Sequence, residues 1–327
     1  MNKFSLESIL NAASESEKKR NWIQASDYYR KAQNQEEYKL FEERKNDNQI
    51  KIKHVKSLIF YTKSWLEQSL KKRKKLLDEW WILETEVLSF YEKNNDNLDR
   101  DRIYLNLLEG SIYYRFWIHT ESPGSQKVLI REGFKIAEKA IQLFSKLNKE
   151  YELALAYCFA IWYIGFGSFF LASKNEIKSL QLKSFNYLNN AFKITKKIPD
   201  KSLLAWVYFA AGVSASSSKH DYVLAIEHIN KSIKYAIISR DNFLICYGKG
   251  LKCLWKLNIY PLLEDPDKQR TTLEGISKLA LETLDQSRII NHRYSIFLGY
   301  NQYSTVQTKL ASIEPDLKTK TSILKKT

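Results

Sequence analysis

The chain has 327 residues, 44% of them hydrophobic and 13% aromatic, and its 52 Lys and Arg against 37 Asp and Glu give a formal charge of +15. This apolar content excludes an intrinsically disordered chain, and 10 Gly with 5 Pro are too few for the turns of a β-sandwich, a barrel or a doubly wound sheet. Because turn residues are so few, we expect an all-α fold of long helices joined by short connections. Three cysteines without a CxxC pair exclude a disulfide framework and a cysteine-built zinc site, so we expect a reducing compartment and a cytoplasmic protein.

The N-terminal segment predicts a helical hairpin. The chain becomes strongly charged soon after Glu7, which is not the pattern of a secretory signal peptide, so we expect the mature chain to start here. Within NWIQASDYYRKAQ, Ala25, Tyr29 and Ala32 recur at the spacing of one helix face. We expect this hairpin and the long basic helices after it to form an N-terminal domain over residues 1–98.

Residues 49–93 predict one or two long helices, because they contain neither Gly nor Pro. Within them, residues 51–75 hold nine basic side chains against Glu67 alone among acidic ones. The densest part is a candidate anion-binding patch made of Lys71, Lys72, Arg73, Lys74 and Lys75.

Three interpretations of this basic segment stay open. It could bind nucleic acid in a salt-dependent way, with Trp65, Trp80 and Trp81 close enough in sequence to stack on bases. It could bind an anionic membrane surface. It could instead be a solvated helix face whose tryptophans are core. We favour the last, because LLDEWWILETEVL turns acidic directly afterwards and no nucleic-acid fold signature accompanies the patch.

A recurring unit follows the polar run NNDNLDRD at 94–101, which reads as a linker. Each copy contains the end of one helix, a short polar turn and the start of the next helix. The copies begin at Ala140, Ala191, Ser232 and Thr283, with spacings of 51, 41 and 51 residues, which is the length of a helical hairpin. Nine residues after each start lies a polar turn residue, and two of these are Asp, a favoured N-cap: Lys149, Asp200, Asp241 and His292.

These hairpins resemble tetratricopeptide (TPR) repeats of the longer, degenerate kind. Ala25, Tyr29 and Ala32 match the spacing of the family's second helix, and Gly110 and Tyr113 in LLEGSIYYR resemble conserved positions of its first helix. The resemblance covers roughly residues 5–35 and 100–308. It implies a TPR-like α-solenoid, a superhelical array of antiparallel helical hairpins, over residues 99–310. Apolar periodicity is lost after Ser312, so we expect a flexible tail over 311–327.

The resemblance also implies a function. Arrays of this kind present an extended concave surface, so we expect a non-enzymatic scaffold that binds a protein or peptide partner, preferably an acidic one given the charge. The first helix of each hairpin lines that surface in the family. Candidate peptide-binding residues in such helices are Arg115, Tyr163, Lys249 and Arg293.

One uncharged stretch has two interpretations. Residues 153–172 are 20 residues long, enough to cross a bilayer, yet a middle helix covered on both sides would have the same composition. We favour the buried helix and expect no membrane partner.

No catalytic template fits the chain. The S-x-x-K spacing of Ser216 and Lys219 lacks its companion motifs, and Gly165 and Gly167 begin a G-x-G-x-x-G pattern that Phe170 interrupts. The five histidines form no metal-binding pair. We therefore expect no enzyme activity, no metal and no cofactor, with an enzyme or sensor holding an enclosed pocket as the third hypothesis.

Overall fold

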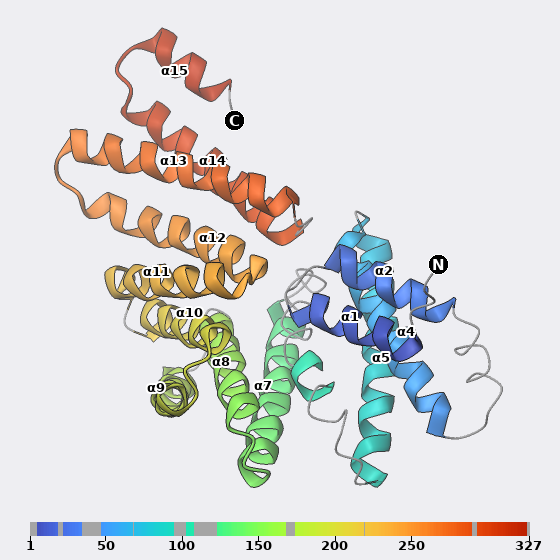
Figure 1. Cartoon of the computed structure of the whole chain (residues 1–327). Coiled ribbons are helices and arrows are strands. Elements are labelled where there is room, and N and C mark those ends of the chain that lie inside the picture. The colour runs from blue at the N-terminus through green and yellow to red at the C-terminus, as the bar shows by residue number, and fades with distance from the viewer. Residues whose placement is uncertain are drawn as a thin grey trace. The chain divides into compact units, whose positions relative to one another are not determined.

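The computed structural model of the chain describes nine segments, and their regular elements are all helical, with no β-strand among them (Figure 1). These segments are residues 5–18, 22–34, 47–67, 69–94, 103–107, 123–167, 174–218, 220–289 and 293–325. The chain divides into two compact units, Met1–Ile198 and Pro199–Thr327. The all-α prediction is confirmed.

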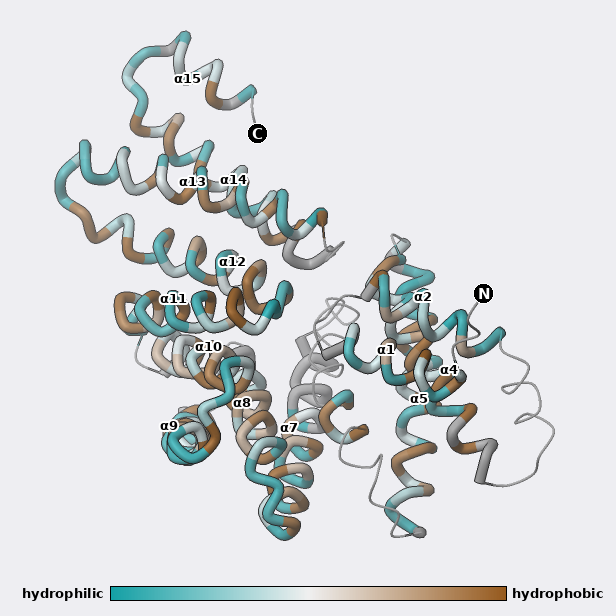
Figure 2. Tube along the Cα trace, viewed as in Figure 1, coloured by the Kyte–Doolittle hydropathy of each residue, from teal (hydrophilic) through white to brown (hydrophobic). Residues whose placement is uncertain are grey.

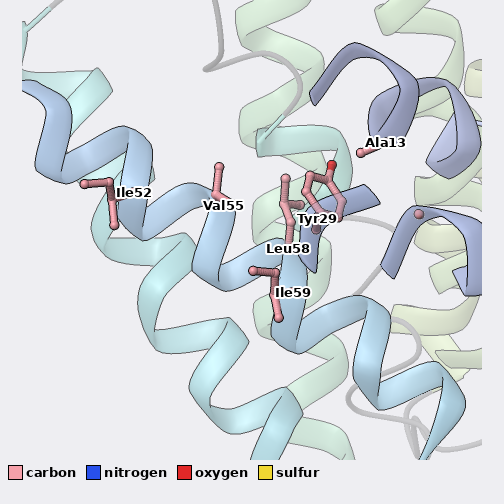
Figure 3. Close-up of a cluster of buried hydrophobic side chains, with 7 residues drawn as sticks. Ala13, Tyr29, Ile52, Val55, Leu58 and Ile59 are labelled. Carbon is pink, nitrogen blue, oxygen red and sulfur yellow. The ribbon is translucent and has the colours of Figure 1, made fainter. Parts of the chain in front are cut away.

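The first unit begins with four packed helices. These are α1 (Leu6–Lys18), α2 (Trp22–Gln33), α4 (Asp47–Leu66) and α5 (Leu70–Asn94). The α1/α2 and α4/α5 pairs form hairpins, and α2 packs on α4. The predicted inner face of α2 is buried, with Ala25, Tyr29 and Ala32 at most 1% exposed. Figure 3 shows Ala13 and Tyr29 beside the apolar face of α4 that carries Ile52, Val55, Leu58 and Ile59.

A second group of helices in this unit consists of α7 (Pro123–Lys146), α8 (Glu150–Gly167) and α9 (Lys174–Lys197). The middle helix, α8, packs on both α7 and α9. It is apolar on all sides for this reason, and every residue from 156 to 165 is buried. Across the described segments, no helix combines the length and the apolar character that crossing a bilayer would require.

The second unit stacks α10 (Lys201–Ser218), α11 (Tyr222–Ser239), α12 (Asn242–Ile259), α13 (Pro266–Ile289) and α14 (Arg293–Ile313) as antiparallel neighbours (Figure 1). A short 3-10 turn, Tyr260–Leu262, follows α12. Each helix packs on the next, and α12 also contacts α10 and α14. Helices α10, α12 and α14 therefore form one layer, with α11 and α13 packed against it.

Aromatic rings join α10 to α12 in this layer. The ring centroids of Trp206 and Phe243 lie 6.1 Å apart, and those of Phe209 and Tyr247 lie 5.7 Å apart. Figure 2 shows hydrophobic residues along most of α10, and the only clearly exposed side chain described on that helix is Lys201. Large apolar rings at this contact supply the burial that holds the hairpins together.

Aspartates begin α10, α11 and α12. Asp200, Asp221 and Asp241 each accept a hydrogen bond through Oδ1 from the backbone N–H three residues later, at 2.8, 3.0 and 3.0 Å. Arg240 closes α11 in the left-handed region, with φ 58°. The predicted N-caps at Asp200 and Asp241 are confirmed, because capping depends on residues that are adjacent in sequence.

The compact units do not coincide with the predicted domains. The expected boundary between residues 98 and 99 lies outside the described residues, so it stays a prediction. The expected flexible tail over 311–327 contains the end of α14 and a further helix, α15 (Leu317–Leu324), which packs on α14. Asp316 caps α15 by accepting from the Thr319 N–H at 2.6 Å. The flexibility of this tail stays a prediction.

Candidate protein-binding surface

Three lysines form a row along α12. Lys249, Lys252 and Lys256 are separated by three and four residues, so they share one face of the helix. All three are half-buried, and the Lys249 side chain is only 16% exposed. We refer to these three residues as the lysine row.

The lysine row faces outward between two neighbouring helices. On one side of it, Gly248 lies against α11, where an added Cβ would come within 3.0 Å of Ile233. On the other side, Cys253 belongs to the apolar cluster that Leu273 and Ile276 of α13 supply. With about 100° of rotation per residue, the lysines occupy the sector of α12 between these two contacts.

The row carries more positive charge than its surroundings neutralise. The Nζ of Lys249 lies 3.4 Å from Oε2 of Glu282 on α13. The pKa of Lys252 is lowered from its ordinary value, first because burial disfavours the ammonium and then because Lys256 and Lys249 repel it. Glu282 opposes this change in the pKa of Lys252 without cancelling it. An anion bound along the row would relieve the repulsion.

An apolar strip runs along α11 next to the row. Its side chains recur at intervals of three and four residues, Val223 and Ile237 are 60% and 58% exposed, and Ile226 and Ile233 are half-buried. We refer to the following residues as the α11 strip: Val223, Ile226, Asn230, Ile233 and Ile237. The contact of Ile233 with Gly248 places the strip and the lysine row on one surface of the second unit.

The four predicted peptide-binding residues have different surroundings. Arg115 lies outside the described residues, and Arg293 begins α14 with its side chain outside the description. Tyr163 is 5% exposed and its ring lies against Gly133 of α7. Of the two whose side chains are described, Lys249 lies on a surface where further cations converge. Peptide contact at these residues stays a prediction.

Lys252, Lys256 and the α11 strip were missed by sequence reasoning. The signal was present in the spacing K-x-x-K-x-x-x-K of α12 and V-x-x-I-x-x-x-N-x-x-I-x-x-x-I of α11. Such spacing alone does not say which face of a helix its neighbours cover.

The predicted anion-binding patch lies in the first turns of α5. Lys71, Lys72 and Lys75 are exposed, whereas Arg73 donates through Nη2 to the Glu67 carbonyl at 2.5 Å and so links the end of α4 to α5. Two of the three neighbouring tryptophans are unavailable for stacking, because Trp65 is 8% exposed and Trp80 is completely buried, whereas Trp81 is half-buried. Their burial fits the interpretation of a solvated helix face with core tryptophans.

Reactive groups elsewhere are engaged in local structure. Ser216 and Ser217 each donate to the Val213 carbonyl of their own helix. The buried carboxylate of Glu84 on α5 accepts from Ser57 on α4, and its Oε2 lies 3.2 Å from Nδ1 of His54. Within the described segments, no group of three or more His, Cys, Asp or Glu side chains is arranged to hold a metal ion.

Comparisons with known proteins add a likeness in shape. No protein-family model matches the chain, and no curated protein matches it in sequence. Among solved structures, the chain is similar to a Rap protein complexed with competence and sporulation factor, with 16% identity and a TM-score of 0.48. That match covers 94% of this chain and 76% of the other.

Proposed function

We propose that this protein is a non-enzymatic scaffold that binds an acidic protein or peptide partner on the helical array of its second unit. The observation that carries the proposal is the lysine row. The three lysines share one helix face, and burial together with the two neighbouring lysines disfavours the charged form of Lys252, a cost that a bound anion would offset. Groups placed in this way commonly mark a functional site.

The surface suits a chain segment that runs along it better than a small molecule. The row spans eight residues of one helix, about 11 Å at 1.5 Å per residue, so its charges match carboxylates spread along a chain. Recognition of such a partner combines charge complementarity with apolar contact, and the α11 strip supplies the apolar part. Binding within a concave face and residence in the cytoplasm stay predictions of the sequence.

A binding titration tests the proposal. Fluorescein-labelled Glu-rich peptides of about 20 residues are added to the full chain, and anisotropy is followed at two salt concentrations. We expect binding that weakens with salt and falls at least about tenfold when Lys249, Lys252 and Lys256 are all replaced by Gln. Circular dichroism establishes that the triple variant is folded.

The matched control replaces Lys71, Lys72 and Lys75 of α5 by Gln, which removes the same charge from exposed positions elsewhere. We expect this variant to bind the peptides as the parent chain does. Random-sequence single-stranded DNA, titrated in parallel, tests the basic segment 51–75. Absence of peptide binding, or equal loss in both triple variants, contradicts the proposal.

A further inference from the structure

We infer that the partner presents an acidic amphipathic α-helix, which lays its apolar face along the α11 strip and its carboxylates along the lysine row. This inference rests on the proposed function and specifies the form of its partner. It follows from three properties of the surface: the spacing of the strip, the charge beside it, and the close approach of α11 to α12.

The spacing of the α11 strip is that of a helix-binding seam. Its members follow one another at intervals of three, four, three and four residues from Val223 to Ile237, as the a and d positions of a heptad do. The residues of α11 that pack within the unit lie on the adjoining face of the helix, about 110° around from the strip: Ala225, Ile229, Ser232 and Ala236. The strip therefore borders the packed face of α11: Ile233 lies against Gly248 of α12, whereas Val223 and Ile237 are open to solvent.

The exposure of the strip is large for apolar side chains. Val223 and Ile237, at its two ends, are 60% and 58% exposed, and the strip between them is about 21 Å long at 1.5 Å per residue. That length accepts about four turns of a partner helix. Asn230 lies at its centre, where a polar side chain in a heptad seam fixes the register of the two helices at some cost in affinity.

The close approach of α11 and α12 joins the strip to the charge. Gly248 has no side chain to separate the two helices, and Ile233 fills the space beside it. On α12, Lys252 and Ile245 come next after Gly248 around the helix. They therefore lie in the part of the exposed sector that is nearest to α11. A helix docked on the strip at the usual 8–10 Å between axes would thus hold one flank over the lysine row.

The charge decides between possible occupants. A second copy of this chain, docked through the same surface about a two-fold axis, would bring two lysine rows toward each other, which like-charge repulsion disfavours. A helix with Glu or Asp on the flank of its apolar seam satisfies both features at once. The acidic helix is therefore the occupant that fits the surface.

The test uses a designed probe. A fluorescein-labelled three-heptad peptide carries Leu and Ile at a and d and Glu at its flanking positions. A second peptide of the same composition has two central residues replaced by Pro, so that it cannot form a helix. Anisotropy with the full chain gives affinity, and circular dichroism at 222 nm follows helix formation on binding. We expect the helical peptide to bind at least about tenfold more tightly.

Two neighbouring isoleucines supply matched variants. Ile237 belongs to the strip, whereas Ile238, with a similar exposure of 55%, points about 100° away around α11. We expect Ile237→Ser to weaken binding of the helical peptide about tenfold and Ile238→Ser to change it less than twofold. Both positions are exposed, so neither change removes a core contact. Val223→Ser, at the other end of the strip, should act like Ile237→Ser.

The outcomes separate this inference from the proposed function. If both peptides bind equally, and the lysine-row variant alone weakens them, the scaffold proposal stands and the helical partner is wrong. Equal effects of Ile237→Ser and Ile238→Ser also overturn the inference. If sedimentation shows a dimer that Ile237→Ser dissociates, a second copy occupies the strip instead. If neither peptide binds, the proposed function fails together with the inference.

Discussion

Gly133 of α7 lies directly against the ring of Tyr163 of α8. A Cβ added at Gly133 would lie 2.5 Å from Cζ and 2.7 Å from the hydroxyl oxygen of that ring, well inside normal contact distance. The absence of a side chain at residue 133 is therefore what allows α7 and α8 to cross this closely. Tyr163 is held by this contact as part of the core.

Gly133→Ala is expected to destabilise the chain by about 1 kcal/mol. The better helix propensity of Ala contributes about 1 kcal/mol, whereas displacing a packed aromatic ring costs about 1–3 kcal/mol. Chemical denaturation followed by circular dichroism measures the change. Gly275→Ala on α13 is the control, because its Cβ would meet nothing within 4 Å, and it should stabilise. A stabilising Gly133→Ala would show that the ring yields freely.

Asp241→Ala is expected to cost about 1 kcal/mol of stability. The carboxylate accepts from the Leu244 N–H at 3.0 Å and is 2% exposed, and a lost N-cap leaves that donor without its bond. Thermal melting measures the loss. Asp241→Asn keeps an acceptor at the same position and should retain most of the stability. Equal effects of the two changes would mean that the cap bond itself contributes little.

The three thiols are expected to be unreactive in the folded chain. Burial raises the pKa of Cys246 to about 11 and of Cys253 to about 12, and it raises the pKa of Cys158 further. Because the thiolate is the reactive form, a disulfide reagent at pH 8 should label the folded chain more than about 100-fold more slowly than free cysteine. In guanidinium chloride all three cysteines should react. Rapid labelling without denaturant would contradict the burial.

Lys252 is expected to lower stability at neutral pH. Its pKa is lowered in the folded chain, first by burial, so the charged form is less favourable when folded than when unfolded. The penalty is present at pH 7 and is lifted as pH rises through the lowered pKa toward the ordinary value of about 10.4.

Lys252→Gln should therefore raise the melting temperature at pH 7 by about 1–2 °C, a small amount because the side chain is only half-buried. The difference from the parent chain should shrink near pH 10.5. Lys278→Gln, at an exposed position of α13, serves as the control and should leave the melting temperature nearly unchanged. A lower melting temperature for Lys252→Gln at pH 7 would show that its charge is already compensated.

The helical class and several helix starts were predictable from sequence because they depend on near neighbours. The spacing of Ala25, Tyr29 and Ala32 marks the buried face of α2, and Asp200 and Asp241 mark the first turns of α10 and α12. Helix periodicity and capping act within about four residues. Helix α15 was not predicted, because it is short and its packing on α14 does not show in a local pattern.

Helices joined in antiparallel hairpins could be predicted from periodic apolar residues and capping aspartates, because both signals act between near neighbours. Which polar side chains are exposed together depends instead on how helices that are distant in sequence pack on one another. The resemblance made Tyr163 a candidate for peptide contact, whereas in the structure its ring lies against Gly133 of α7. Lys249 became part of a charged surface because Glu282 of α13 and the exposed seam of α11 lie beside it. The environment of a side chain depends on residues far away in sequence, whereas the period of its helix does not.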